Sequence, residues 1–188
     1  MTAPRVPEED RVALVSALVA AGQSVATCES LTAGLAAAMI ADVPGASAVL
    51  RGGLITYATD LKQTLADVDP ALLGTQGPVS QETAAQMALG ARHRCGADWA
   101  VSLTGVAGPT PQDGHPVGEV FLGIAAPDGT VESLRVLPEP DDDNDEAADG
   151  IAGEVLQGTR WEIRRQSVDF ALHQLLLRVV EQNSRKNR

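Results

Sequence analysis

This chain has few aromatic residues and few cysteines. Only 3% of its 188 residues are aromatic although 44% are hydrophobic, so a core must be built mainly from Ala, Val, Leu and Ile. Two cysteines, Cys28 and Cys95, are too few for a disulfide framework and are typical of a reducing compartment. We therefore expect a cytoplasmic protein with an aliphatic core.

Positive charge is also scarce. Lys and Arg number 14 against 25 Asp and Glu, which gives a formal net charge of −11. Because proteins bind nucleic-acid backbones through clustered Lys and Arg, this balance argues against nucleic acid as a partner. The N-terminus has neither a basic start nor a long apolar run, so no signal peptide and no membrane partner is expected.

Several familiar catalytic patterns are missing. The chain has no Walker phosphate loop, no G-x-G-x-x-G, no G-x-S-x-G and no zinc-ligand spacing. The three histidines, His93, His115 and His173, are scattered. The acidic run at 141–146 superficially resembles a calcium loop but lacks its glycine and its final glutamate. We therefore expect neither a metal site nor a cofactor.

Helical and strand patterns alternate along the chain without an internal repeat. This order favours an α/β fold, and we predict a three-layer α/β/α sandwich with a mixed sheet, formed by residues 1–188 as a single domain. The segment at about 138–157 is acidic and poor in apolar residues, so we expect a flexible loop there. The expected helices cover about 7–22, 31–40, 60–66, 80–95 and 159–181, and the expected strands begin near 24, 48, 98, 119 and 130.

Ser30 follows the first predicted strand and begins the next predicted helix. Amide groups at a helix N-terminus have no intrahelical acceptors, so they can hold a phosphate or a developing oxyanion. Serine at such a position is commonly only a helix cap, and the local pattern leaves both readings open.

A serine nucleophile without a histidine needs another base, and lysine is the candidate. The chain has two lysines, of which Lys186 lies in a polar tail and Lys62 follows Tyr57, the sole tyrosine. A lysine acts as a base only when burial or a nearby cation keeps it neutral, and a tyrosine hydroxyl beside it can relay a proton. The alternatives are a solvated helix lysine and a half-buried strand tyrosine.

Five further motifs occur in order along the chain. They are ESLTAG at 29–34, RGGLITY at 51–57 with Lys62, GPVS at 77–80, TGVAGP at 104–109 with PVG at 116–118, and GTRWEIR at 158–164. Together they resemble the C-terminal domain family of CinA, whose active members are nicotinamide mononucleotide amidohydrolases. The resemblance extends from about residue 7 to 181.

The resemblance implies that Ser30, Tyr57 and Lys62 are the catalytic set. Ser30 would attack the carboxamide carbon of the nicotinamide ring to give an acyl-enzyme and ammonia, Lys62 would be the base, and Tyr57 would orient groups or relay protons. Water would then release nicotinic acid mononucleotide. The partners implied are this small nucleotide and further copies of the chain in a homo-oligomer.

The remaining candidate residues would bind the substrate. From geometry we expect oxyanion donors among the amides of 31–33 or of 104–107. Arg51, Arg160 and Arg164 are candidates for the substrate phosphate or for structural ion pairs. The predicted substrate-binding residues are Leu31, Thr32, Ala33, Gly34, Arg51, Thr104, Gly105, Ala107 and Arg164.

Three departures from the family pattern stand out. Ala33 replaces a glycine, the loop at 110–115 lacks the usual paired glycines and lysine, and the acidic segment has the character of an insertion. These changes leave an alternative open, in which the protein binds a nucleotide or takes part in competence without catalysis.

Overall fold

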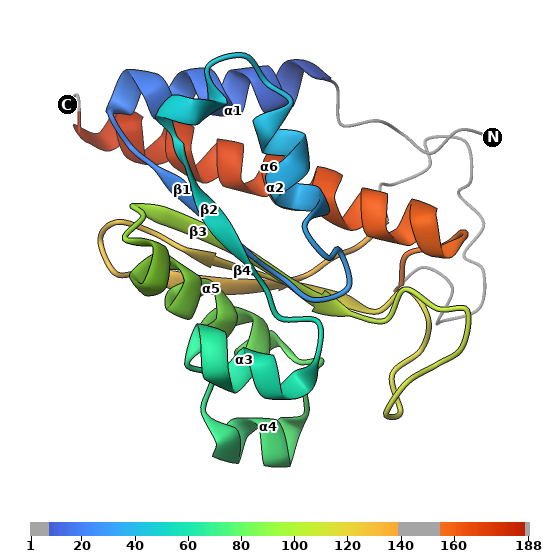
Figure 1. The fold of residues 1–188 in the computed structure, drawn as a ribbon. Coiled ribbons are helices and arrows are strands. Elements are labelled where there is room, and N and C mark those ends of the chain that lie inside the picture. Colours follow the sequence, from blue (N-terminus) through green and yellow to red (C-terminus); the bar gives the residue numbers. More distant parts are fainter. Residues whose placement is uncertain (1–7, 139–154, 187–188) are drawn as a thin grey trace.

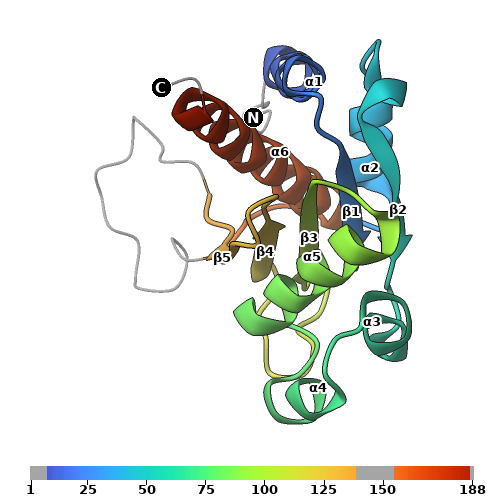
Figure 2. The same cartoon turned by 90° about the vertical axis from the view of Figure 1, so that its left-hand side faces the viewer.

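A mixed five-stranded sheet forms the middle layer of the computed structural model, which describes residues 8–138 and 155–186. The strand order is β2-β1-β3-β4-β5, as Figure 2 shows. β1 pairs in parallel with both β2 and β3, whereas β4 runs antiparallel between β3 and β5. The strands are β1 (Val25–Glu29), β2 (Leu50–Ile55), β3 (Trp99–Gly105), β4 (Val120–Ala125) and β5 (Val131–Arg135).

Helices cover both faces of this sheet (Figures 1 and 2). α1, α2 and α6 lie on one face, and α3, α4 and α5 lie on the other. The predicted three-layer α/β/α architecture with a mixed sheet is confirmed. The helices are α1 (Glu8–Ala21), α2 (Leu35–Ala41), α3 (Thr59–Ala66), α4 (Pro70–Gln76), α5 (Gln81–Cys95) and α6 (Arg160–Lys186), with a short 3₁₀ helix at Ala46–Ala48.

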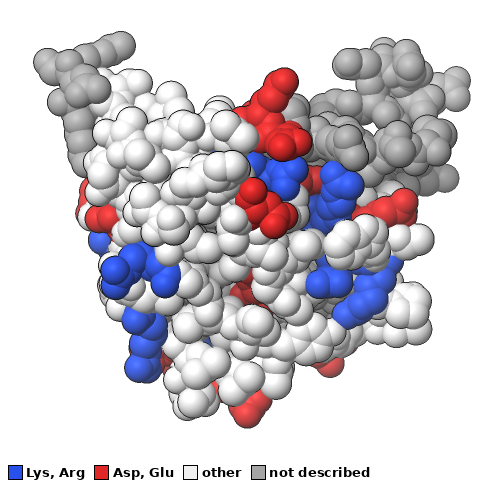
Figure 3. All heavy atoms as spheres, turned by 45° about the horizontal axis from the view of Figure 1, so that its top comes forward, with Lys and Arg blue, Asp and Glu red and all other residues white. Residues whose placement is uncertain are grey.

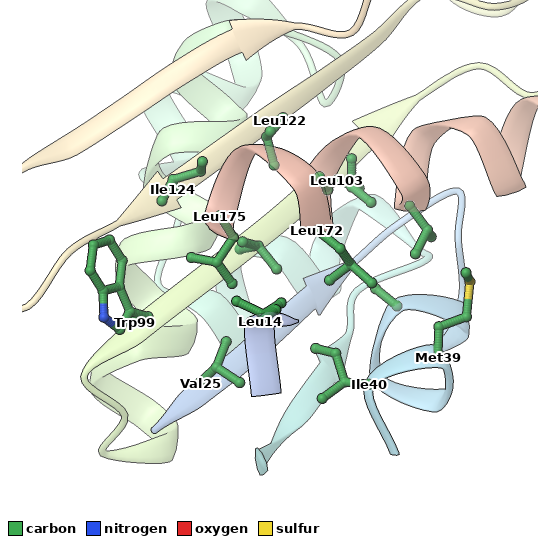
Figure 4. Close-up of a cluster of buried hydrophobic side chains, with 14 of the residues drawn as sticks. Leu14, Val25, Met39, Ile40, Trp99, Leu103, Leu122, Ile124, Leu172 and Leu175 are labelled. Carbon is green, nitrogen blue, oxygen red and sulfur yellow. The ribbon is translucent and has the colours of Figure 1, made fainter. Parts of the chain in front are cut away.

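The larger hydrophobic cluster lies between the sheet and the α1, α2 and α6 layer (Figure 4). Leu14 and Leu172 are fully or almost fully buried there, from helices at opposite ends of the chain. Trp99 is the one large aromatic side chain labelled in this cluster, and its indole N–H donates to Gln23 Oε1 at 3.0 Å. The core is otherwise aliphatic, because the chain supplies few aromatic residues.

α3 and α5 approach closely on the opposite face. A Cβ atom added to Gly90 of α5 would stand 1.8 Å from the backbone oxygen of Ala66, the last residue of α3. Glycine is therefore required at this crossing, because any side chain would force the two helices apart. The contact fixes the position of α3 relative to the sheet.

Three details differ from the sequence expectations. α4 is an additional helix that is not predicted from the sequence. The helix expected from Leu31 begins four residues later, at Leu35. The acidic segment lies mostly outside the described residues, but its end is packed rather than flexible, since Leu156 is buried and its amide donates to Gly118 O at 3.0 Å.

On the face that Figure 3 shows, acidic and basic side chains lie beside each other near the top of the view, and other charged side chains lie among uncharged ones. None of the helices among the described residues has the length and apolar character needed to cross a membrane.

Candidate active site

The parallel strands bring Ser30 beside Thr56. Glu29 at the end of β1 pairs with Ile55 at the end of β2, so the next residues leave the sheet together. The Ser30 amide donates to Leu103 O at 2.9 Å, and the Thr56 amide donates to Glu29 O at 2.9 Å. Ser30 therefore lies at the carboxyl edge of three adjacent parallel strands, the usual position for a site in an open α/β sheet.

Lys62 reaches this edge from α3. Its Nζ lies 2.9 Å from Ser30 Oγ and 2.9 Å from the Thr56 carbonyl oxygen, and the side chain is only 1% exposed. Burial disfavours the charged form and lowers the pKa of Lys62 from 10.5 to about 8. Ser30 thus contacts an amine that can give up its proton near neutral pH.

A cavity of about 240 Å³ opens above this serine–lysine pair. Its walls come from the turn after β1, the segment between β2 and α3, the segment before α5, the loop between β3 and β4, and the start of α6. The predicted site residues that line it are Ser30, Leu31, Tyr57, Lys62, Thr104, Gly105 and Ala107.

Tyr57 and Arg160 form one rim of this cavity. The Tyr57 side chain is half exposed, and its hydroxyl accepts a hydrogen bond of 2.6 Å from Arg160. Arg160 also donates to the carbonyl oxygen of Gly108. Within the described structure the Tyr57 hydroxyl has no hydrogen bond to Ser30 or Lys62, so the structure places it over the cavity rather than in the serine–lysine contact.

The turn between β1 and α2 differs from the predicted serine-capped helix start. Ala33 has a positive φ of 51°, and the Gly34 amide donates to the buried carboxylate of Glu29 at 2.9 Å. The Ala36 and Ala37 amides donate to the same carboxylate at 3.0 and 2.9 Å. The N-terminus of α2 is therefore already occupied by a side chain and offers nothing to a ligand.

Two amides of the turn remain available. The Ala33 amide donates to Ser30 O at 3.2 Å. Among the described residues, no acceptor lies on the amides of Leu31 and Thr32. Of the turn residues expected to bind substrate, Thr32, Ala33 and Gly34 do not line the cavity.

Two predicted binding arginines lie elsewhere. Arg51 is at the start of β2, the opposite edge of the sheet, where its Nε donates to Cys95 O at 3.0 Å. Arg164 donates to the carbonyl oxygens of Leu31 and Thr32 at 3.0 and 2.8 Å. Arg51 is thus too far along the strand to reach the cavity. Arg164 stabilises the turn through its carbonyl oxygens and does not line the cavity.

Sequence reasoning missed several residues of the cavity wall. Thr110, Pro111 and Gln112 line it, so the loop that departs from the family pattern faces the site directly. Thr59, Pro78, Val79 and Gly108 also line it, whereas Val106 lies within the predicted 104–107 segment and Arg160 is one of the candidate arginines. The buried carboxylate of Glu29 was also missed, although it stands next to Ser30 in the first motif.

No group of three His, Cys, Asp or Glu side chains is arranged to hold a metal ion in residues 8–138 and 155–186. The acidic run that resembles a calcium loop lies outside these residues.

Fold and site together define an α/β protein with a buried serine–lysine pair at the carboxyl edge of its parallel strands. Residues 8–157 match the family described as the CinA C-terminal domain. The chain belongs to this family.

Curated relatives carry matching names. A "CinA-like protein" of Frankia casuarinae is 50% identical over 121 residues, which are 64% of this chain and 28% of that protein. A "Putative competence-damage inducible protein" of Halalkalibacterium halodurans is 37% identical over 174 residues, 93% of this chain and 37% of that protein. The chain thus spans little more than a third of such relatives at most.

A solved structure agrees over nearly the whole chain. The competence/damage inducible protein CihA from Agrobacterium tumefaciens is 33% identical with a TM-score of 0.79, over 95% of this chain and 98% of that one. A CinA superfamily protein from Klebsiella pneumoniae is 25% identical with the same TM-score, over 93% and 98% of the two chains.

Proposed function

We propose that this protein hydrolyses the carboxamide of nicotinamide mononucleotide to nicotinic acid mononucleotide and ammonia. The observation that carries the proposal is the 2.9 Å contact between Lys62 Nζ and Ser30 Oγ at the floor of a cavity. A serine hydroxyl beside a neutral, desolvated amine is an activated nucleophile. Family membership supports a site of this kind, because the family includes amidohydrolases.

The first half of the reaction acylates Ser30. Neutral Lys62 takes the Ser30 hydroxyl proton as Oγ bonds to the carboxamide carbon. The Lys62 ammonium then gives that proton to the amide nitrogen, the C–N bond breaks, and ammonia leaves. A base whose pKa is close to the working pH suits both transfers, because it must accept and return the same proton.

The second half returns the enzyme to its starting state. Lys62 takes a proton from water as the water oxygen bonds to the acyl carbon. The bond to Oγ breaks and Ser30 recovers its proton from Lys62. Nicotinic acid mononucleotide is released, and its new carboxyl group gives the second proton of the water to solvent.

Oxyanion stabilisation falls to a free amide of the turn. We assign it to the Leu31 amide, which lines the cavity and has no acceptor within the described part of the chain, with the Ala107 amide as the alternative on the facing loop. Arg160 is the cationic side chain at the rim, and we assign it to the substrate phosphate together with the Tyr57 hydroxyl that it holds.

The test is ammonia release from nicotinamide mononucleotide by the purified protein. Ser30→Ala and Lys62→Ala each abolish release while the circular dichroism spectrum is kept. The matched control is Ser184→Ala, which removes an exposed hydroxyl near the end of α6 and leaves release unchanged. Substrate binding by the wild-type protein without ammonia release would overturn the proposal and favour a silent nucleotide-binding role.

A further inference from the structure

Glu29 is a buried carboxylate that the proposed chemistry does not use. The side chain is 1% exposed, and its two oxygens accept four hydrogen bonds. Three come from backbone amides at the start of α2, and the fourth comes from the Thr27 hydroxyl at 3.0 Å. Every partner is a donor, so this pocket is built for a carboxylate rather than for a neutral amide.

The backbone of Glu29 is linked to Lys62 through Thr56. Its carbonyl oxygen accepts from the Thr56 amide, and the Thr56 carbonyl oxygen accepts from Lys62 Nζ. Lys62 in turn contacts Ser30, the next residue along the chain from Glu29. The main chain of Glu29 thus closes a ring through Thr56, Lys62 and Ser30, while its side chain holds the turn that follows Ser30.

Gly53 leaves room for the Thr27 side chain that donates to Glu29. A Cβ atom on Gly53 of β2 would stand 2.3 Å from Thr27 Oγ1, the hydroxyl that donates to Glu29. Glycine at this position lets the Thr27 side chain lie against the neighbouring strand. Gly53 therefore supports the Glu29 carboxylate through Thr27.

We infer that Glu29 is a positioning residue for Ser30: its carboxylate fixes the turn at 31–37 so that Oγ lies against Lys62 and Leu31 lies at the cavity. This inference rests on the proposed function of the serine–lysine pair. Glu29 does not line the cavity, so it acts through Ser30 and the turn rather than on the substrate.

The informative change is Glu29→Gln, which keeps the shape of the side chain. Its NH₂ group would face at least one backbone N–H, so the turn loses a bond and relaxes away from the strand. Since misplacement of a reacting group by about 1 Å can cost about 100-fold in rate, we expect kcat on nicotinamide mononucleotide to fall about 10- to 100-fold. KM stays within about twofold, because the residues that line the cavity are intact.

A second readout needs no substrate. A fluorophosphonate probe labels Ser30 by forming an Oγ–P bond as fluoride leaves and Lys62 takes the proton. We expect Glu29→Gln to slow this labelling by the same factor as kcat. Thr27→Val removes only one of the four donors and slows labelling less, which gives a graded series where the glutamine variant folds poorly.

The control is Asp98→Asn. Asp98 is the matching carboxylate at the other end of β1, where its Oδ2 accepts from the Ser24 amide and hydroxyl at 2.8 and 2.7 Å. This variant loses stability but keeps the labelling rate within about twofold, because its site is remote from Ser30. Equal labelling rates in the glutamine variant and this control would overturn the inference. Slower labelling of Glu29→Gln in a protein that releases no ammonia from nicotinamide mononucleotide would keep the inference and remove only the proposed substrate.

Discussion

At the scale of a single residue, the function of Lys62 depends on its burial and on the partners of its Nζ. It is almost fully buried, and its Nζ contacts a serine hydroxyl and a backbone carbonyl oxygen rather than a carboxylate. A carboxylate partner would favour the ammonium form, whereas burial alone favours the neutral amine. The site therefore stabilises the protonation state that a base requires.

The dependence of rate on pH follows from this. Lys62 must be neutral to accept the Ser30 proton, and its pKa is about 8. We expect kcat/KM to rise about tenfold per pH unit below pH 8 and to level off above it. Initial rates of ammonia release between pH 5.5 and 10 measure this profile. A flat profile across pH 7 to 9 would mean that Lys62 is not the base.

Burial of Lys62 also costs stability, with a defined sign. Its pKa is about 8 when folded and 10.5 when unfolded, so the unfolded chain binds more protons between these values. The contribution of Lys62 to stability therefore becomes more favourable as pH increases from about 8 to 10.5, and below about pH 8 the full cost of roughly 3 kcal/mol is present.

Lys62→Met isolates this cost. The variant cannot titrate at this position, so its free energy of unfolding relative to wild type should be highest near pH 7 and about 3 kcal/mol lower by pH 10.5. Urea unfolding of both proteins at several pH values gives the difference, in which the other titrating groups cancel. A difference that does not change with pH contradicts the assigned pKa.

At the scale of elements, α3 matters because it carries Lys62. Gly90→Ala would place a methyl group 1.8 Å from the Ala66 backbone oxygen and push α3 away from α5. We expect a loss of about 1–3 kcal/mol in the free energy of unfolding and slower labelling of Ser30. Urea denaturation and fluorophosphonate labelling measure the two effects.

Gly74→Ala provides the contrast within the same layer. Gly74 lies in α4, and a Cβ atom there would meet nothing within 4 Å. Because alanine favours a helix more than glycine does, this variant should gain about 0.5–1 kcal/mol and keep its labelling rate. Equal effects of the two substitutions would show that the α3–α5 crossing is not tight.

Most elements could be predicted from the sequence because their patterns are local. β3 is a continuous buried run, and the hairpin of β4 and β5 has a Pro-Asp-Gly turn at 127–129. The start of α2 was misplaced because Leu31 and Thr32 read as helix. Its amides are instead capped by Glu29, a side chain from the preceding strand, and no helix signal in 31–40 reveals that partner.

The site was less predictable, because it depends on register. Ser30 and Lys62 are 32 positions apart, and they meet only because β1 and β2 are parallel with Glu29 opposite Ile55. Arg51 illustrates the same limit. Arg51 begins the RGGLITY motif at 51–57, whose last residue, Tyr57, lines the cavity. The residues between them form β2, so Arg51 lies at the opposite end of that strand.

At the scale of the whole molecule, the net charge of −11 opposes a negatively charged nucleotide. For a sphere of roughly 20 Å radius, the size expected for a domain of this length, the repulsion at contact is about 1 kcal/mol at 10 mM salt. It falls to about half of that at 150 mM salt, where the Debye length is about 8 Å. Arg160 at the cavity rim attracts the phosphate locally, but over a few ångströms salt changes this attraction by only a few tenths of a kcal/mol.

Salt therefore weakens the repulsion by the net charge more than it weakens the attraction by Arg160. We expect kcat/KM for nicotinamide mononucleotide to rise about twofold between 10 and 150 mM salt. Initial rates at low substrate concentration measure this, and labelling of Ser30 by an uncharged fluorophosphonate is the control, since it should not respond to salt. Arg160→Gln should lower kcat/KM and increase the relative gain with salt, because the remaining field is purely repulsive. A fall in kcat/KM with salt in the wild-type protein would show instead that the field of Arg160 dominates the approach of the substrate.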